Sequence, residues 1–370
     1  MFNTTEWMKK ALLFFCFSIT LTFSQEKAPG YFDVQLFRGN VVKHTDDIGH
    51  LITGHPDGFL LSYNWKTFGK KEWEQVYNYP DYGISFHYLD FKNQYLGYNV
   101  ALGLHYNFYF LNRNLMFRIS QGIGVTSNPY DKESNNKNNA FGTRVMDNTY
   151  LMLQYKKENI FNRIGFQAGF MLTHFSNGRL KAPNSGINTI ALNIGLNYNL
   201  TSEKKEFITD SLPSRVSYKE RIKYNIVLRT GVSEGPVPYL GQRQFYHFGF
   251  YADKRIGRKS ALQIGTDVFL SRYLIDYIEF TSVAFPEKNI DATTDYKRIG
   301  LVLGHELFIN KLSIETQLGY YVYKPFNYET NLYQRLGAKY YIYKNIFAGV
   351  SLKAHGGRAE AIEASLGVRL

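Results

Sequence analysis

The segment 312–324, LSIETQLGYYVYK, alternates between apolar and polar side chains. Its apolar positions are Leu312, Ile314, Leu318, Tyr320 and Val322, and its polar or small positions are Ser313, Glu315, Gln317 and Gly319. Successive side chains of a β-strand point to opposite faces, so this segment predicts a strand with one apolar and one polar face. The last ten residues, AIEASLGVRL, repeat the pattern and end on the apolar Leu370.

The same alternation recurs in segments of about ten residues from Gly30 to the end of the chain. The predicted strands are 31–42, 58–67, 82–91, 95–111, 115–127, 149–159, 164–178, 187–200, 223–235, 244–256, 260–272, 296–309, 312–324, 332–343, 346–355 and 359–370. No stretch of helical periodicity competes with them, so an all-β fold is predicted.

The connections between these strands differ in length on the two sides. Short turns follow every second strand, at 112–114, 160–163, 257–259, 310–311 and 344–345. Longer polar loops lie between them, at 43–57, 128–148, 178–187 and 273–292. Outer-membrane barrels have this asymmetry, with the short turns on the periplasmic side.

Two connections on the short side, 68–81 and 201–222, break this rule, and the second is polar enough to be a linker. We therefore predict a closed antiparallel outer-membrane β-barrel of roughly 14–16 strands. The alternative is an eight-stranded barrel over 30–200 followed by a second β domain. Either way, apolar faces would point outward and polar faces inward, and Lys353 and His355 would join a lumenal charge network with Glu363 and Arg369.

Composition excludes two other classes of protein. Aromatic residues make up 17% of the chain, which is too much apolar material for a disordered segment. The mean hydropathy of -0.31 argues against a bundle of transmembrane helices. The net charge of +12 is dispersed along the strands, so anionic lipid head groups or phosphorylated sugars are expected as counter-ions and nucleic acid is not.

The N-terminus has the features of a signal peptide. Lys9 and Lys10 precede an apolar stretch, 11–23, and Thr22 and Ser24 are small residues at the spacing that signal peptidase accepts. Residues 1–24 are thus a predicted signal peptide, followed by barrel strands in 25–200, a linker or long turn at 201–222, and further strands in 223–370. Cleavage would remove Cys16, the one cysteine, and with it any Cys-ligated metal site.

One hairpin carries a possible catalytic group on its outer face. By parity, His174 and Ser176 extend the outward apolar row of strand 164–178 near its loop end. Asn188 opens the apolar face of the next strand, across the hairpin from Ser176. A hydroxyl beside an imidazole is the minimal unit for nucleophilic acyl transfer, and a third polar group fixes the tautomer. The alternative is that these are interfacial polar residues where the strand leaves a membrane.

The longer string, His174 to Gly178 (HFSNG) and Lys181 to Ile187 (KAPNSGI), resembles the active-site segment of the lipid A 3-O-deacylase (PagL-like) and acyloxyacyl hydrolase family. The resemblance implies an eight-stranded outer-membrane barrel that removes an ester-linked acyl chain from lipid A without a metal or other cofactor. It implies that Ser176 is the nucleophile, His174 the general base, and Asn177 and Asn184 candidates to bind the oxyanion.

The sequence departs from the family at Asn188, which stands where the family has the glutamate of its Ser-His-Glu triad. An amide can accept a hydrogen bond from imidazole but supplies no negative charge. Strands in 31–200 match the family barrel in number and in motif placement, whereas 201–370 has no counterpart in the small enzyme. The expected function is an outer-membrane esterase acting on lipid A or lipopolysaccharide; the alternative is a porin-like channel or a structural barrel.

Overall fold

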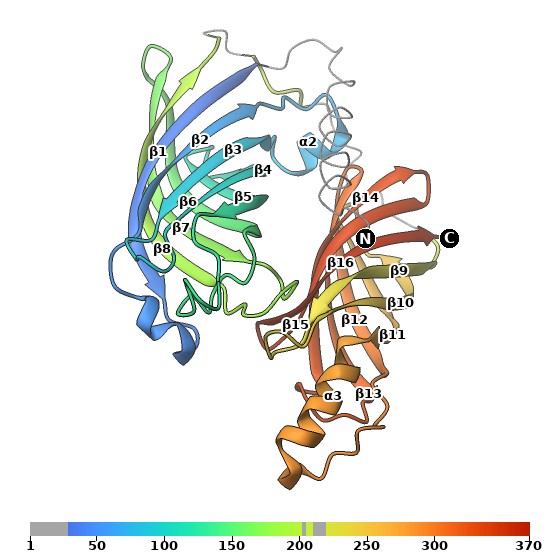
Figure 1. Cartoon of the computed structure of the whole chain (residues 1–370). Coiled ribbons are helices and arrows are strands. Elements are labelled where there is room, and N and C mark those ends of the chain that lie inside the picture. Colours follow the sequence, from blue (N-terminus) through green and yellow to red (C-terminus); the bar gives the residue numbers. More distant parts are fainter. Residues whose placement is uncertain (1–28, 202–204, 210–219) are drawn as a thin grey trace, which may run out of the picture.

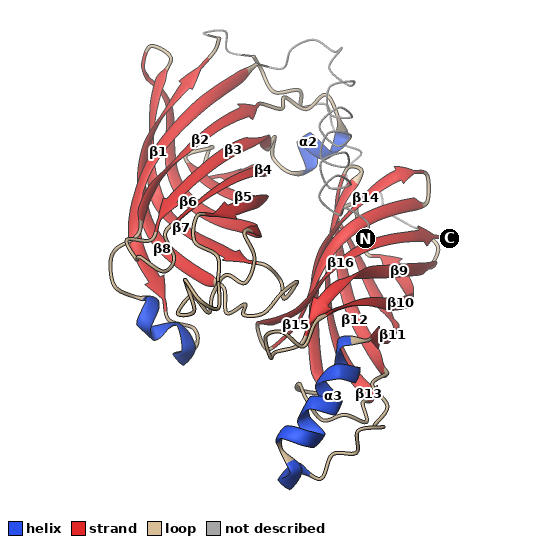
Figure 2. Ribbon diagram, in the orientation of Figure 1, coloured by secondary structure: helices blue, strands red, loops and turns tan. Residues whose placement is uncertain are grey.

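The computed structural model describes residues 29–370 except 202–204 and 210–219 (Figure 1). The predicted signal peptide, and most of the predicted linker, lie outside the described residues. The described residues form sixteen strands, arranged as two closed antiparallel barrels of eight strands each. Figure 2 shows that strands dominate both barrels and that the short helices lie at their ends.

The first barrel, called barrel 1, consists of β1 (Gly30–Val42), β2 (Asp57–Trp65), β3 (Asp81–Asp90), β4 (Tyr98–Phe110), β5 (Leu115–Thr126), β6 (Val145–Phe161), β7 (Ile164–Ser176) and β8 (Ile187–Asn199). Barrel 2 consists of β9 (Lys223–Glu234), β10 (Gln242–Arg255), β11 (Ser260–Ser271), β12 (Arg298–Ile309), β13 (Leu312–Tyr323), β14 (Leu332–Tyr343), β15 (Ile346–His355) and β16 (Arg358–Arg369). Helical segments are η1 (Asp46–Leu51), α2 (Glu72–Val76), α3 (Tyr273–Ala284) and η2 (Pro286–Lys288).

The chain closes on itself twice. β8 pairs with β1 from Tyr31–Asn199 to Val42–Asn188, and β16 pairs with β9 from Ala364–Thr230 to Arg369–Asn225. The predicted all-β barrel class and strand number are confirmed, but the single closure is corrected to the two-barrel alternative. The reason is that pairing of β8 with β1 leaves no free edge in barrel 1, so β9 can pair only within the second half.

The side-chain pattern on both walls is the reverse of that in a water-soluble barrel. Large apolar residues point outward, as at Leu36, which is 61% exposed. Charged residues point inward and pair there: Arg118 lies 2.8 Å from Asp33 in barrel 1, and Arg335 lies 2.7 Å from both Asp267 and Glu363 in barrel 2. This arrangement is typical of transmembrane barrels.

The predicted charge network in the second half exists, with different partners. Lys353 binds Glu360, and His355 Nδ1 lies 3.4 Å from the Glu360 carboxylate. Arg369 instead reaches Asp253, at 2.8 Å. Because parity fixes only the face of a side chain, partners on distant strands could not be assigned from it.

Helix α3 lies within a segment for which a loop, without helical structure, was expected. Its buried residues Tyr273, Leu274 and Ile278 pack with Phe326 at the loop end of barrel 2. The segment is rich in aromatic and β-branched residues, whose intrinsic preference is for strands, so packing on the barrel overrides propensity here. Among the described residues, no helix is both long and apolar enough to cross a membrane.

Candidate active site

The three candidate catalytic residues lie at the loop end of barrel 1, on the neighbouring strands β7 and β8. The register pairs His174 with Asn188, and the ladder between the two strands ends at the pair Phe175–Ile187. Asn188 therefore lies opposite His174 and not opposite Ser176, as the sequence suggested. Ser176 is instead paired on its other side with Asp147 of β6.

The side chains form a continuous hydrogen-bonded series. Asn188 Oδ1 lies 2.7 Å from His174 Nδ1, and His174 Nε2 lies 3.0 Å from Ser176 Oγ. An amide oxygen only accepts, so Nδ1 carries the proton and donates it to Asn188. Nε2 is then free to accept the hydroxyl hydrogen of Ser176, which is the arrangement that a general base requires.

Gly186 packs directly against this pair. A Cβ built on Gly186 would lie 3.1 Å from His174 Cε1 and 3.1 Å from Ser176 Cβ. Its φ of +67° is also in the left-handed region, so a side chain at this position would be strained as well as crowded. This close approach contributes to the low exposure of Ser176, which is 5% exposed.

The two oxyanion candidates lie together in the loop 177–186, which we call the catalytic loop. The backbone N–H of Asn177 donates to Asn184 Oδ1 at 2.8 Å. The Asn177 side chain donates to the Lys181 carbonyl at 2.7 Å and accepts from the Arg179 N–H at 2.9 Å. Asn177 thus orders the loop and orients Asn184, whose Nδ2 makes no hydrogen bond to any described residue.

A polar cluster next to Ser176 was missed by the sequence reasoning. Asp147 points outward from β6 and accepts a hydrogen bond from Gln121 Nε2, while Thr149 Oγ1 lies 3.1 Å from Asp147 Oδ2. A carboxylate on an apolar outer wall is costly, so Asp147 is a further candidate functional residue. The signal was available: Val145, Asp147 and Thr149 continue the outward row of β6, but the strand was predicted to begin at 149.

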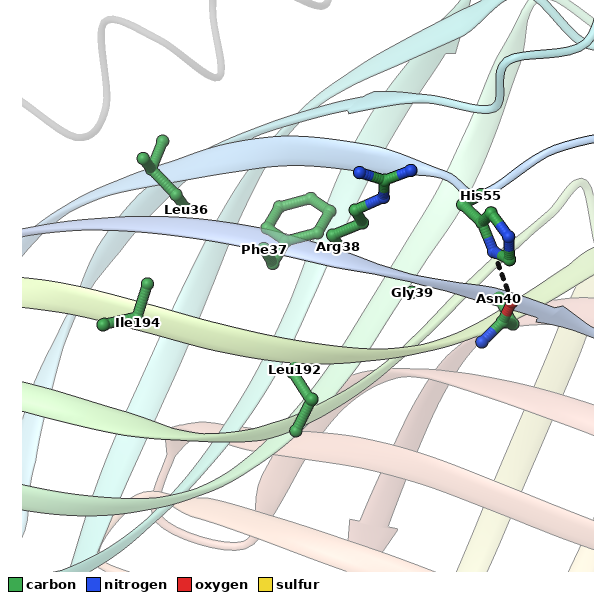
Figure 3. Close-up of a pocket in the computed structure, with 8 residues that line it drawn as sticks. All are labelled: Leu36, Phe37, Arg38, Gly39, Asn40, His55, Leu192 and Ile194. Carbon is green, nitrogen blue, oxygen red and sulfur yellow. Dashed lines mark hydrogen bonds between the residues drawn. The ribbon is translucent and has the colours of Figure 1, made fainter.

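A groove lies on the outer wall between β1 and β8, on the face of β8 that also carries Asn188 (Figure 3). Its volume is about 560 Å³, and its lining includes Leu36, Arg38, Asn40, Leu192 and Ile194. Leu192 is four residues from Asn188 on the same face of β8, or about 13 Å along the strand. His55 Nδ1 donates to Asn40 Oδ1 at 2.7 Å at one end of the groove.

Metal ligands do not gather within the described residues: no group of three or more His, Cys, Asp or Glu side chains there could hold a metal ion.

Comparison with solved structures finds similarity to bacterial porins. A triple mutant of the Rhodopseudomonas blastica porin is 7% identical, over 92% of this chain and 99% of the porin, with a TM-score of 0.19. A second mutant of that porin is also 7% identical, with the same coverage and a TM-score of 0.20. Similarity at such TM-scores supports no conclusion about this chain. A comparison with curated proteins finds no sequence match.

Family models match both halves of the chain. Residues 57–197 match the model described as lipid A 3-O-deacylase (PagL). Residues 222–370 match the model described as acyloxyacyl hydrolase, C-terminal domain. The first match contains β2 to β7 and most of β8, with His174, Ser176 and Asn188, and the second contains all of barrel 2. The chain therefore belongs to the lipid A 3-O-deacylase (PagL) and acyloxyacyl hydrolase family.

Proposed function

We propose that the protein is an outer-membrane esterase that hydrolyses an ester-linked acyl chain of lipid A. The observation that carries the proposal is the series Ser176–His174–Asn188, with contacts of 3.0 and 2.7 Å, on the outward face of a barrel from a deacylase family. The apolar outer walls and the predicted signal peptide support a location in the outer membrane.

In this mechanism Ser176 Oγ attacks the ester carbonyl while His174 Nε2 accepts the hydroxyl proton of Ser176. The tetrahedral intermediate then collapses, and the imidazolium returns the proton to the departing sugar hydroxyl. Water attacks the acyl-serine with His174 again as base, which releases a fatty acid and frees Ser176. Asn184 Nδ2 would bind the oxyanion, held in place by the Asn177 N–H.

Asn188 performs one of the two roles of the family glutamate. It holds the imidazole in the productive tautomer but carries no charge to stabilise the imidazolium. Asp147, paired with Ser176 across β6 and β7, would add negative charge from the serine side. Because Asn188 lacks the charge of the family glutamate, we expect activity with a low turnover.

The groove farther along the same wall as Asn188 would hold part of the substrate. Leu36, Leu192 and Ile194 offer an apolar surface for an acyl chain, and the exposed guanidinium of Arg38 suits an anionic group. Lipid A or lipopolysaccharide would thus present its ester laterally to the wall without leaving the membrane.

A channel function has less support. Each barrel has eight strands, and an eight-stranded barrel has an interior just wide enough for side chains to fill it. Buried charged residues, including Arg118 and Arg335, occupy the two lumens.

The test is lipid A hydrolysis by the purified full-length protein and by Ser176→Ala, followed by mass spectrometry of the lipid. The parent should release one acyl chain, and Ser176→Ala should release none above the blank. Ser185→Ala, in the same loop, is the matched control and should behave like the parent. Equal acyl loss from the parent and from Ser176→Ala would refute the proposal.

A further inference from the structure

The catalytic loop reaches across to barrel 2, whose role the family resemblance leaves open. Figure 1 shows the loop ends of the two barrels next to one another. The residues of the loop that contact barrel 2 are Gly178, Arg179, Leu180 and Ala182. They lie between Asn177 and Asn184, the two oxyanion candidates.

Glu234, the last residue of β9, makes a direct bond to the loop. Its Oε2 accepts from the Ala182 N–H at 2.6 Å, and its Oε1 accepts from the Tyr239 N–H at 3.1 Å. The residue is 3% exposed. A buried carboxylate needs such donors, so Glu234 ties the catalytic loop to the β9–β10 connection of barrel 2.

Arg179 is held on both its backbone and its side chain. Its carbonyl accepts from the Glu234 N–H at 3.1 Å and from Ser233 Oγ at 3.3 Å. Its Nη1 donates to the Tyr328 hydroxyl at 3.0 Å and lies 3.5 Å from Glu329. Burial lowers the pKa of Arg179, but the neighbouring Tyr328, Tyr273 and acidic groups outweigh this and raise the pKa, so the guanidinium stays charged.

Gly178 and Leu180 complete the contact. A Cβ on Gly178 would lie 2.3 Å from Ile362 Cγ1 of β16, so the backbone itself packs on barrel 2. The Leu180 carbonyl accepts from Gln242 Nε2 at 2.6 Å. Four successive or nearly successive residues are therefore fixed by side chains or backbone of the second barrel.

Hydrogen bonds within the catalytic loop connect these contacts to the residues of the candidate active site. The Arg179 N–H donates to Asn177 Oδ1, and the Asn177 N–H donates to Asn184 Oδ1. Asn177 also directly follows Ser176 in the chain. A displacement of Arg179 would thus move both oxyanion candidates relative to Ser176.

We propose that barrel 2 is a positioning domain for the catalytic loop, with Arg179 and Glu234 as positioning residues. This rests on the proposed function of the Ser176 site. A loop of ten residues loses conformational entropy on ordering, and external contacts offset that cost. Catalytic donors must be held within about 0.5 Å of the productive geometry, and misplacement by about 1 Å costs roughly 100-fold in rate.

The test measures kcat and KM for lipid A hydrolysis in the full-length protein and in Arg179→Ala and Glu234→Gln. Both variants should lower kcat by about 10- to 100-fold with KM within about twofold of the parent. Arg179→Lys, which keeps the charge, should recover part of the loss. Arg243→Ala is the matched control, because Arg243 is on the same barrel rim but pairs with Asp276 at 2.7 Å.

Hydrogen exchange of the catalytic loop gives a second readout that does not depend on activity. The amides of Asn177 and Ala182 should exchange faster in Arg179→Ala and Glu234→Gln, with the strands of both barrels unchanged. An unchanged kcat, or unchanged exchange, in folded variants would overturn the positioning role. If the parent hydrolyses no lipid A, the proposed function fails, and the exchange rates alone decide whether barrel 2 orders the loop. If one variant does not fold, the other carries the test.

Discussion

Barrel 1 and barrel 2 each contain a serine, a histidine and a third polar group joined in the same order. On the wall of barrel 1, His174 links Ser176 to Asn188. In the lumen of barrel 2, His247 Nε2 lies 2.9 Å from Ser271 Oγ, and its Nδ1 lies 2.7 Å from Glu363. By residue type the second series is closer to a Ser-His-Glu triad than the first.

The surroundings of the two series favour the barrel 1 series as the candidate active site, despite its residue types. His247 is 0% and Ser271 1% exposed, and Arg298 Nη2 already donates to Ser271 Oγ at 2.8 Å. Glu363 is shared with Arg335 and with Ser351, at 2.7 and 2.8 Å. In barrel 2 the three groups therefore belong to a closed ion network, whereas in barrel 1 they lie on the outer wall. Placement on the outer wall and spare hydrogen-bonding capacity, more than the order in which the three groups are joined, distinguish the candidate active site from the structural series.

The largest expected difference between the two serines is in covalent labelling. A fluorophosphonate bearing an alkyl chain should attach to Ser176, with loss of fluoride, and leave Ser271 unmodified because no reagent reaches it. Intact-mass spectrometry should show one adduct on the parent and on Ser271→Ala, and none on Ser176→Ala. An adduct that persists in Ser176→Ala and disappears in Ser271→Ala would reverse the assignment.

Changing the third group of the barrel 1 series should alter turnover strongly in both directions. Asn188→Ala removes the acceptor of the His174 Nδ1 proton and should lower kcat by about 10²- to 10⁴-fold. Asn188→Glu restores a negative charge and should raise kcat by about tenfold. Initial rates of fatty acid release measure both, with Ile190→Ala on the same face of β8 as control. Equal rates for Asn188→Ala and the parent would show that Asn188 does not orient His174.

The corresponding change in barrel 2 should affect stability and not turnover. Glu363→Gln leaves Arg335 and His247 with a neutral partner in a buried network, which should cost about 3–5 kcal/mol of unfolding free energy. Urea unfolding in detergent micelles measures the loss. Asp276→Asn, at a partly exposed ion pair on the barrel rim, should lower the stability much less. A large fall in kcat in Glu363→Gln at unchanged stability would contradict the structural role of this series.

The smallest expected effect is on substrate binding along the barrel 1 groove. Arg38→Gln removes the positive charge from the groove and should raise KM for lipid A by about 2- to 5-fold, with kcat unchanged. Lys157→Gln, near the turn end of the outer wall, serves as the control and should leave KM unchanged. The same KM for Arg38→Gln and the parent would remove Arg38 from the binding site.

Much of the fold and most of the candidate site were predictable because their signals are local. The period of two fixes both the strands and their faces, and His174, Ser176 and Asn188 lie within one hairpin. The pair of strands that closes each barrel was not predictable in the same way, since the pairing of β8 with β1 joins residues as far apart in sequence as Tyr31 and Asn199. The Ser271–His247–Glu363 series and the contact of Glu234 with Ala182 likewise depend on distant segments, and Asp147 was missed through a misplaced strand start.

The outward orientation of Ser176 has a kinetic consequence for an enzyme that works from this wall. Both products of acyl transfer can remain in the lipid phase, which avoids about 0.8 kcal/mol for each methylene that would otherwise enter water. The relevant substrate concentration is then molecules per unit of membrane area and not per unit of volume. Adding neutral detergent at a constant bulk concentration of lipid A lowers the density of lipid A in the micelle surface and would slow such an enzyme. Adding more mixed micelles of the same composition leaves that density unchanged and would not slow it.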